Sequence, residues 1–169
     1  MLDRWYLWSR GQVGRGCSTA SGGLAMVMLS RQQEQDLGLW RNLFKLSSYV
    51  AQTLERRLMR SHGIGLTDYM ALDAMREREP KSYRMQELAD ELGVNQSTLS
   101  RVATRLEKGA LVERYTSEHD RRCTMIRLTD TGRERLGEYT DTFNAELHTA
   151  LEMAAVSPDL APLLIKIRS

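Results

Sequence analysis

Two short amphipathic segments that meet at a glycine, with a hairpin pattern directly behind them, limit what this chain can fold into more than any other feature. In MQELADELGVNQSTLSRVATRLEKG, apolar residues recur at helical spacing on both sides of Gly93. Asn95 is suited to cap the second segment, and Gly109 is suited to end it. Two short helices joined by a tight turn form a helix-turn-helix. We expect the second helix to bury a stripe formed by Leu99, Val102, Ala103 and Leu106.

The stretches on either side of SEHDRRC predict the hairpin, because residues 111–116 and 123–128 show a strand-like alternation of apolar and polar side chains, which Met125 and Ile126 interrupt in the second strand. A hairpin in this position is a wing. When the neighbouring helix occupies the major groove of DNA, a wing lies over the minor groove, and a narrow A·T-rich minor groove attracts arginine. Because phosphate repels a carboxylate, we interpret the tip aspartate as the group that orients a guanidinium. The predicted wing residues are Asp120, Arg121 and Arg122.

The first turns of the second helix carry a polar face made of short hydrogen-bonding side chains, unlike the long charged residues of an ordinary solvated helix. Glutamine pairs with adenine, arginine with guanine, and serine or threonine with phosphates or base edges. A capped surface helix is the simpler interpretation, but the hairpin directly after it favours DNA binding. The candidate DNA-contacting residues are Asn95, Gln96, Ser97, Thr98, Ser100, Arg101 and Arg105.

Positive charge is concentrated in the same part of the chain. The 169 residues carry a formal net charge of only +2, whereas residues 95–127 contain seven basic and four acidic side chains, a local net charge of +3. Local concentration is what matters for an anion-binding face. We therefore expect phosphate contacts from Arg101, Arg105, Arg114 and Arg121.

Several other classes of protein find no support in the sequence. Cys17 and Cys123 form no disulfide framework and no CxxC pair, which favours a reducing cytoplasm. The apolar runs are too short for a membrane span. Neither a phosphate-binding glycine loop nor a nucleophile elbow is present, and the one loose grouping of possible metal ligands, Glu118-His119-Asp120, lies at a hairpin tip that is poorly suited to preorganise a site. We therefore expect no enzyme, no cofactor and no metal site.

The remaining segments predict three functional regions within a mainly α fold that carries a small β-wing. Residues 1–33 are rich in glycine and serine and predict a flexible leader, while residues 34–64 and 133–169 predict long helices for dimerisation. Residues 65–132 form the winged helix-turn-helix lobe, with Thr67 as a helix cap.

The terminal helices hold more apolar surface than the lobe can cover, which is typical of a protein interface. The predicted dimer contacts are Trp40, Leu43, Phe44, Leu160, Leu163, Leu164 and Ile167. The final helix is expected to have Ser157 as its N-cap and Pro158 as its first residue.

Residues 85–134 resemble the winged helix-turn-helix core of MarR-type transcriptional regulators, including the wing pattern of an aspartate, one intervening residue and an arginine. The resemblance implies a homodimer that reads a pseudo-palindromic operator in double-stranded DNA, most often as a repressor released by a small-molecule effector. It assigns the minor-groove contact to Arg122, its orientation to Asp120, and a phosphate contact to Arg121.

Two other functions stay open on the sequence alone. A winged-helix adaptor uses the same face for protein contacts, and a small-molecule binding protein needs no DNA site. Cys123 follows Arg122, whose charge predicts a lowered pKa for the thiol.

Overall fold

The computed structural model describes residues 30–117, 120 and 123–168, and Gln35–Ser169 form one compact unit. The predicted leader lies outside the described residues except for its last four. There the prediction needs correction, because helix α2 spans Arg31–His62 and so begins three residues before the predicted start. Ser30 and Gln33 form a capping box: the Gln33 N–H donates to Ser30 Oγ at 3.3 Å, and the Ser30 N–H donates to Gln33 Oε1 at 2.8 Å.

Helix α3, Leu66–Arg78, begins one residue before the predicted cap. Its N-cap is Gly65 rather than Thr67. The reason is Asp68, the third residue of the helix. Its Oδ2 accepts a hydrogen bond from the Gly65 N–H at 2.9 Å, as the acidic residue of a capping box does.

The helix-turn-helix is confirmed. Helix α4 spans Met85–Glu91 and helix α5 spans Gln96–Lys108, and Gly93 between them has a φ of +63°, a conformation that favours glycine. Asn95 caps α5, since its Oδ1 accepts from the Thr98 N–H at 2.8 Å. The predicted stripe of four apolar residues on α5 is buried.

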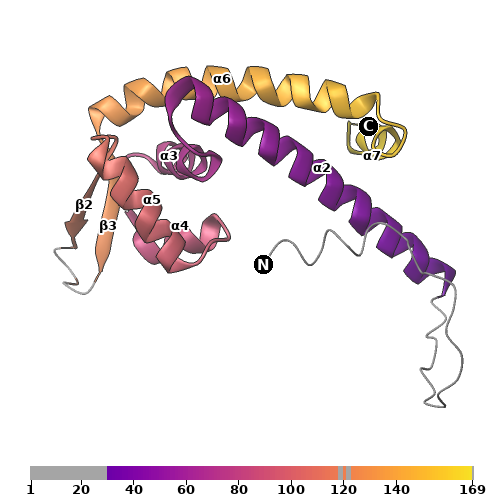
Figure 1. Cartoon of the computed structure of the whole chain (residues 1–169). Helices are drawn as coiled ribbons and strands as arrows, with labels where there is room; N and C mark the ends of the chain where they lie inside the picture. Colours follow the sequence, from indigo (N-terminus) through magenta and orange to yellow (C-terminus); the bar gives the residue numbers. More distant parts are fainter. Residues whose placement is uncertain (1–29, 118–119, 121–122, 169) are drawn as a thin grey trace, which may run out of the picture. The chain divides into compact units, whose positions relative to one another are not determined.

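A three-stranded antiparallel sheet forms the wing. Strand β2, Val112–Thr116, pairs with β3, Thr124–Leu128, from Val112 opposite Leu128 to Thr116 opposite Thr124. This confirms the predicted hairpin to within one residue at the start of each strand. The sequence did not reveal β1, Tyr83–Arg84, which pairs with the other edge of β3, because two residues are too short to display alternation. Figure 1 shows the hairpin directly after α5, with α4 beside α5.

Two helices complete the chain. Helix α6, Asp130–Ala155, is capped by Thr129, whose Oγ1 accepts from the Gly132 N–H at 2.9 Å. Helix α7, Ala161–Arg168, begins later than predicted. Its delayed start places Pro162 in the first turn, where a missing N–H removes no intrahelical hydrogen bond.

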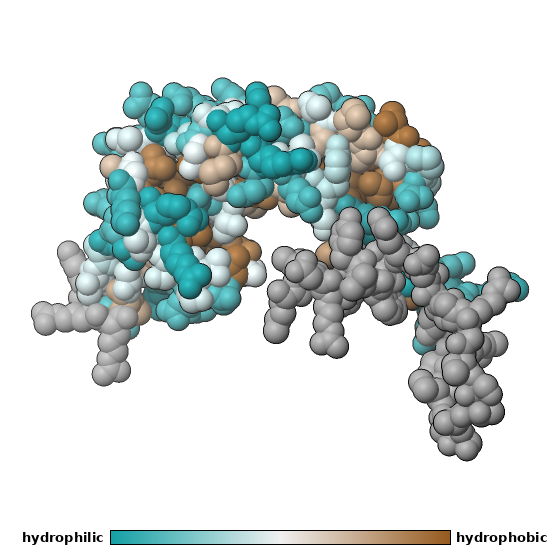
Figure 2. Space-filling view, viewed as in Figure 1, coloured by the Kyte–Doolittle hydropathy of each residue, from teal (hydrophilic) through white to brown (hydrophobic). Residues whose placement is uncertain are grey.

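The apolar side chains pack into two clusters. The larger joins α3, α4, α5, the sheet and the first turns of α6, with Leu58 of α2 also included. The smaller joins Leu46 of α2, Ala154 of α6 and three leucines near the C-terminus. Those leucines, Leu160, Leu163 and Leu164, are buried within a single chain, so they are not the free contact surface that the sequence predicted. Figure 2 shows hydrophobic atoms gathered over the C-terminal end of α6 and over α7.

Within the described residues, no helix combines the length and the apolarity needed to cross a membrane.

Candidate nucleic-acid interface

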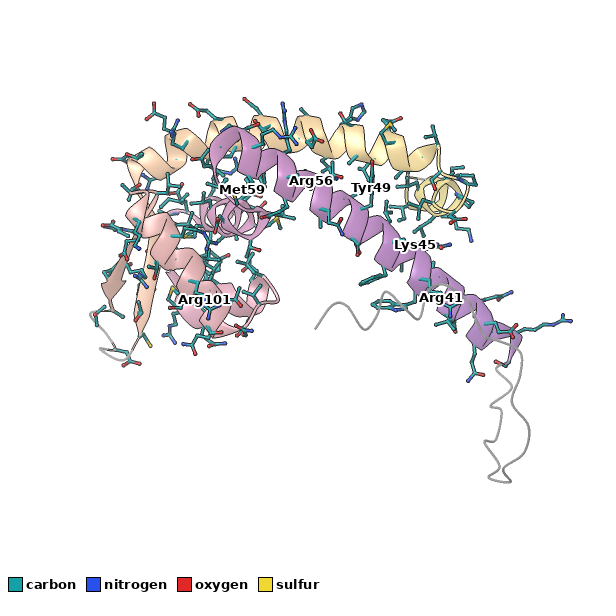
Figure 3. The ribbon with its side chains drawn as sticks, in the orientation of Figure 1. Arg41, Lys45, Tyr49, Arg56, Met59 and Arg101 are labelled. Carbon is teal, nitrogen blue, oxygen red and sulfur yellow. The ribbon has the colours of Figure 1, made fainter. Side chains whose placement is uncertain are left out.

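The polar face predicted on α5 is exposed. Burial of Leu99, Val102, Ala103 and Leu106 turns the opposite side of the helix outward. Four side chains of the predicted set lie exposed on that side: Gln96, Ser97, Ser100 and Arg101. Figure 3 labels Arg101 on α5, and Arg101 makes no ion pair with any described residue. The face therefore offers amide, hydroxyl and guanidinium groups to a partner.

Asn95 and Thr98 serve the helix itself. Asn95 Oδ1 accepts both the Thr98 N–H and, at 2.7 Å, the Ser97 hydroxyl. Because the Ser97 proton is used in this bond, Ser97 presents mainly acceptor lone pairs outward. Thr98 is half-buried. Within the predicted set, these contacts separate the capping residues from the residues whose groups point outward.

Two of the predicted phosphate contacts are already paired inside the protein. Arg105 Nε and Nη2 donate to the Asp68 carboxylate at 3.0 and 2.5 Å, so two of its three nitrogens are occupied. Arg114 pairs with Glu107, and this hydrogen bond lowers the pKa of Glu107 below its usual value. Phosphate contacts by these two arginines therefore stay a prediction. Arg101 and Lys108 are the α5 cations that make no ion pair within the described part of the chain.

The wing tip is described in part. Asp120 is exposed, its backbone oxygen accepts from the Cys123 N–H at 2.9 Å, and its Oδ2 accepts from Cys123 Sγ at 3.1 Å. Arg121 and Arg122 lie outside the described residues, so the predicted minor-groove contact and its orientation by Asp120 stay predictions.

The prediction of a lowered thiol pKa at Cys123 is wrong. The pKa of Cys123 is raised, first by its hydrogen bond to Asp120 and then by desolvation and by the negative charge of that carboxylate. At neutral pH the side chain is therefore a thiol rather than a reactive thiolate. Among the residues that the structure describes, no group of three or more His, Cys, Asp or Glu side chains is placed to hold a metal ion.

Sequence reasoning missed Asp68, whose carboxylate is buried and holds Arg105 of α5. Its spacing from Gly65 could have indicated its role at the helix start, because an acidic residue three positions after the N-cap is typical of a capping box. Nothing in the sequence indicates that the same carboxylate reaches a side chain thirty-seven residues later.

Comparison with known proteins is consistent with this geometry. Residues 62–122 match the MarR family model. The chain is 33% identical over 104 residues to the transcriptional repressor MprA of Escherichia coli strain K12. The aligned residues make up 62% of this chain and 58% of MprA. The chain thus spans less than two thirds of the length of the curated relatives it matches.

Solved structures match over more of the chain. Sco3205, a MarR family transcriptional regulator from Streptomyces coelicolor in complex with DNA, is 26% identical, with a TM-score of 0.66 over 83% of this chain and 86% of its own. AbsC, another MarR family regulator from the same organism, is also 26% identical, with a TM-score of 0.65 over 83% of this chain and 91% of its own.

A capped helix-turn-helix followed by a three-stranded wing defines a winged helix-turn-helix protein. Within that class, residues 62–122 match the MarR family model, and the chain shares the fold of the MarR family regulators Sco3205 and AbsC.

Proposed function

We propose that this protein is a sequence-specific DNA-binding transcriptional regulator that acts as a homodimer on a pseudo-palindromic operator. The observation that carries the proposal is the outward face of α5, where Gln96, Ser100 and Arg101 lie exposed at the N-terminal end of the helix that a helix-turn-helix inserts into the major groove. MprA, described as a transcriptional repressor, and Sco3205, solved in complex with DNA, support the proposal by similarity. Repression with release by a small-molecule effector is the mode that we propose.

The dimer is proposed from the exposure of α2. Of its 32 residues, only Leu46, Leu54 and Leu58 are buried. Trp40 and Phe44 are 61% and 56% exposed, although large aromatic side chains are usually covered. A second copy of the chain is the occupant we propose for this surface, to which Leu39 and Leu43 of the same helix belong. Exposed Ile167 of α7 is proposed as a further dimer contact. We accordingly assign dimerisation to residues 34–64 and 133–169, and DNA binding to residues 65–132.

The wing is proposed to contact the minor groove through Arg122, with Arg121 on a phosphate. Two-fold symmetry of the dimer places the two α5 helices about one DNA turn apart, ~34–36 Å. Operator symmetry then matches protein symmetry.

Replacing Arg101 by alanine tests whether the outward face of α5, which we call the reading face, binds DNA. We expect Arg101→Ala to lower specific DNA affinity by about 1–3 kcal/mol, because Arg101 is the α5 arginine that is exposed and makes no ion pair with a described residue. Fluorescence anisotropy of a labelled operator duplex, measured over a series of salt concentrations, gives the affinity and its salt slope. If Arg101 contacts a base, its loss relaxes specificity at one position of the operator. If it contacts a phosphate, its loss lowers the salt dependence of binding by about 1 in slope.

Arg135→Ala is the matched control. Arg135 lies on α6, is as exposed as a typical surface arginine and pairs with Glu138 at 3.2 Å. Its loss should leave operator affinity unchanged. Equal affinities for the Arg101 and Arg135 variants would contradict the assignment of the reading face.

A further inference from the structure

Asp68 is the one buried charged side chain among the described residues, at 1% exposure. Its carboxylate accepts two hydrogen bonds from Arg105 in the two-pronged arrangement, from Nη2 at 2.5 Å to Oδ1 and from Nε at 3.0 Å to Oδ2. Such a pair fixes direction as well as distance, because both components are planar. The contact joins the first turn of α3 to the C-terminal half of α5.

The same carboxylate also forms a hydrogen bond with the backbone at the start of α3. Asp68 Oδ2 accepts from the Gly65 N–H at 2.9 Å, and the next N–H, that of Leu66, donates to Glu55 of α2. Gly65 fits between the two acids: a Cβ at this position would lie 3.1 Å from Glu55 Oε1 and 3.5 Å from Asp68 Oδ2. Hydrogen bonds therefore run from α2, through the N-terminus of α3, to the recognition helix α5.

We infer that Asp68 is a positioning residue that sets the orientation of α5 relative to α2 and α3 through Arg105, and that Arg105 supports DNA recognition from behind the interface rather than by binding phosphate. This inference rests on the proposed function for its DNA readout. The Asp68 carboxylate is buried whereas the Arg105 side chain is 57% exposed, so the carboxylate requires its partner: loss of Arg105 would leave it as an uncompensated buried charge. The exposed pairs elsewhere on the lobe, such as Arg127 with Glu113, carry no such requirement.

The two roles of Arg105 predict opposite effects of the same substitution. If Arg105 acts on phosphate, Asp68→Asn releases a cation and operator binding tightens. If Asp68 positions α5, the same variant weakens specific binding. Arg105→Lys separates the roles again, because lysine replaces arginine at a phosphate but not in a two-pronged bond to a carboxylate.

The DNA experiment compares full-length wild type, Asp68→Asn, Arg105→Lys and the double variant on the operator duplex and on a scrambled duplex, below the unfolding temperature of each protein. We expect each single variant to lose specific affinity by about tenfold, with non-specific affinity and salt slope unchanged. The double variant should lose no more than either single variant, since both remove one interaction. Glu138→Gln, which removes the exposed partner of Arg135 on α6, is the matched control and should bind as wild type does.

A second measurement needs no DNA. Spin labels at Arg56 of α2 and Arg101 of α5, both exposed and labelled in Figure 3, report the distance between the two helices when Cys17 and Cys123 are serine and labelled chains are diluted with unlabelled ones. Asp68→Asn should broaden or shift that distance distribution, and Glu138→Gln should not.

The outcomes separate the inference from the proposed function. Tighter operator binding by Asp68→Asn, or wild-type binding by Arg105→Lys, would overturn the positioning role. An unchanged spin-label distribution in Asp68→Asn would overturn it as well, even if the protein bound no specific duplex. Altered distances together with an absence of any specific duplex would instead support the positioning role and refute DNA regulation.

Discussion

Gly132→Ala should destabilise the protein by about 3 kcal/mol or more, the largest effect on folding that we expect from one methyl group. A Cβ at Gly132 would lie 2.0 Å from the Leu111 carbonyl oxygen and 2.9 Å from the carbonyl carbon. These are backbone atoms at the junction of the recognition helix and the wing, so no side-chain rotation relieves the overlap. The same oxygen accepts from the Thr129 N–H at 3.1 Å, and displacing it would loosen the start of α6.

Urea unfolding followed by circular dichroism measures this change in the free energy of unfolding. Gly137→Ala on the same helix is the matched control, because a Cβ there meets nothing within 4 Å. We expect that variant to gain up to about 1 kcal/mol from the better helix propensity of alanine. A Gly132→Ala variant as stable as wild type would contradict the close approach of α6 to Leu111.

Removing Trp40 and Phe44 together should dissociate the proposed dimer. The two rings lie 6.3 Å apart on α2 and are both more than half exposed, which is the arrangement expected of aromatic anchors at an interface. At about 2 kcal/mol or more for each of the two positions, summed over both protomers, the double alanine variant should raise the dimer dissociation constant by roughly a thousandfold. Sedimentation velocity over a range of protein concentrations gives that constant.

Met70→Ala is the control for this experiment. Met70 is an exposed apolar residue of α3, at 42% exposure, outside the helices assigned to dimerisation. Its variant should remain dimeric. Since neither aromatic ring is buried in the single chain, the double variant should unfold cooperatively like the wild type. A wild-type protein that sediments as a monomer at every concentration would contradict the proposed interface.

Local rules predicted most of the lobe. Asn95 caps α5 and Gly93 ends the helix before it, as their residue types predict, and the stripe on α5 is buried as its spacing indicates. Where prediction missed, a non-local contact or an extremely short element was responsible. Gly65 displaced Thr67 as a cap because Asp68 reaches back to it, and β1 has only two residues.

The candidate site was predicted less completely, because exposure and pairing are tertiary properties. Periodicity places Gln96 and Arg101 outward, and they are exposed. It cannot distinguish them from Arg105, which lies on the same helix but is held by an aspartate thirty-seven positions earlier. The same limit applies to Leu163, whose apolar character predicted an interface although Leu46 and its neighbours already cover it within one chain.

The central claim is that this protein recognises one DNA sequence as a symmetric dimer. Selection of bound duplexes from a random pool, with purified full-length protein at a fixed and stated salt concentration, tests it most directly. The result we predict is enrichment of an inverted repeat whose half-sites lie about one helical turn apart. Weak, salt-sensitive binding to every duplex, unchanged after the protein has been unfolded and refolded to remove any bound ligand, would contradict the claim and would favour a protein–protein adaptor.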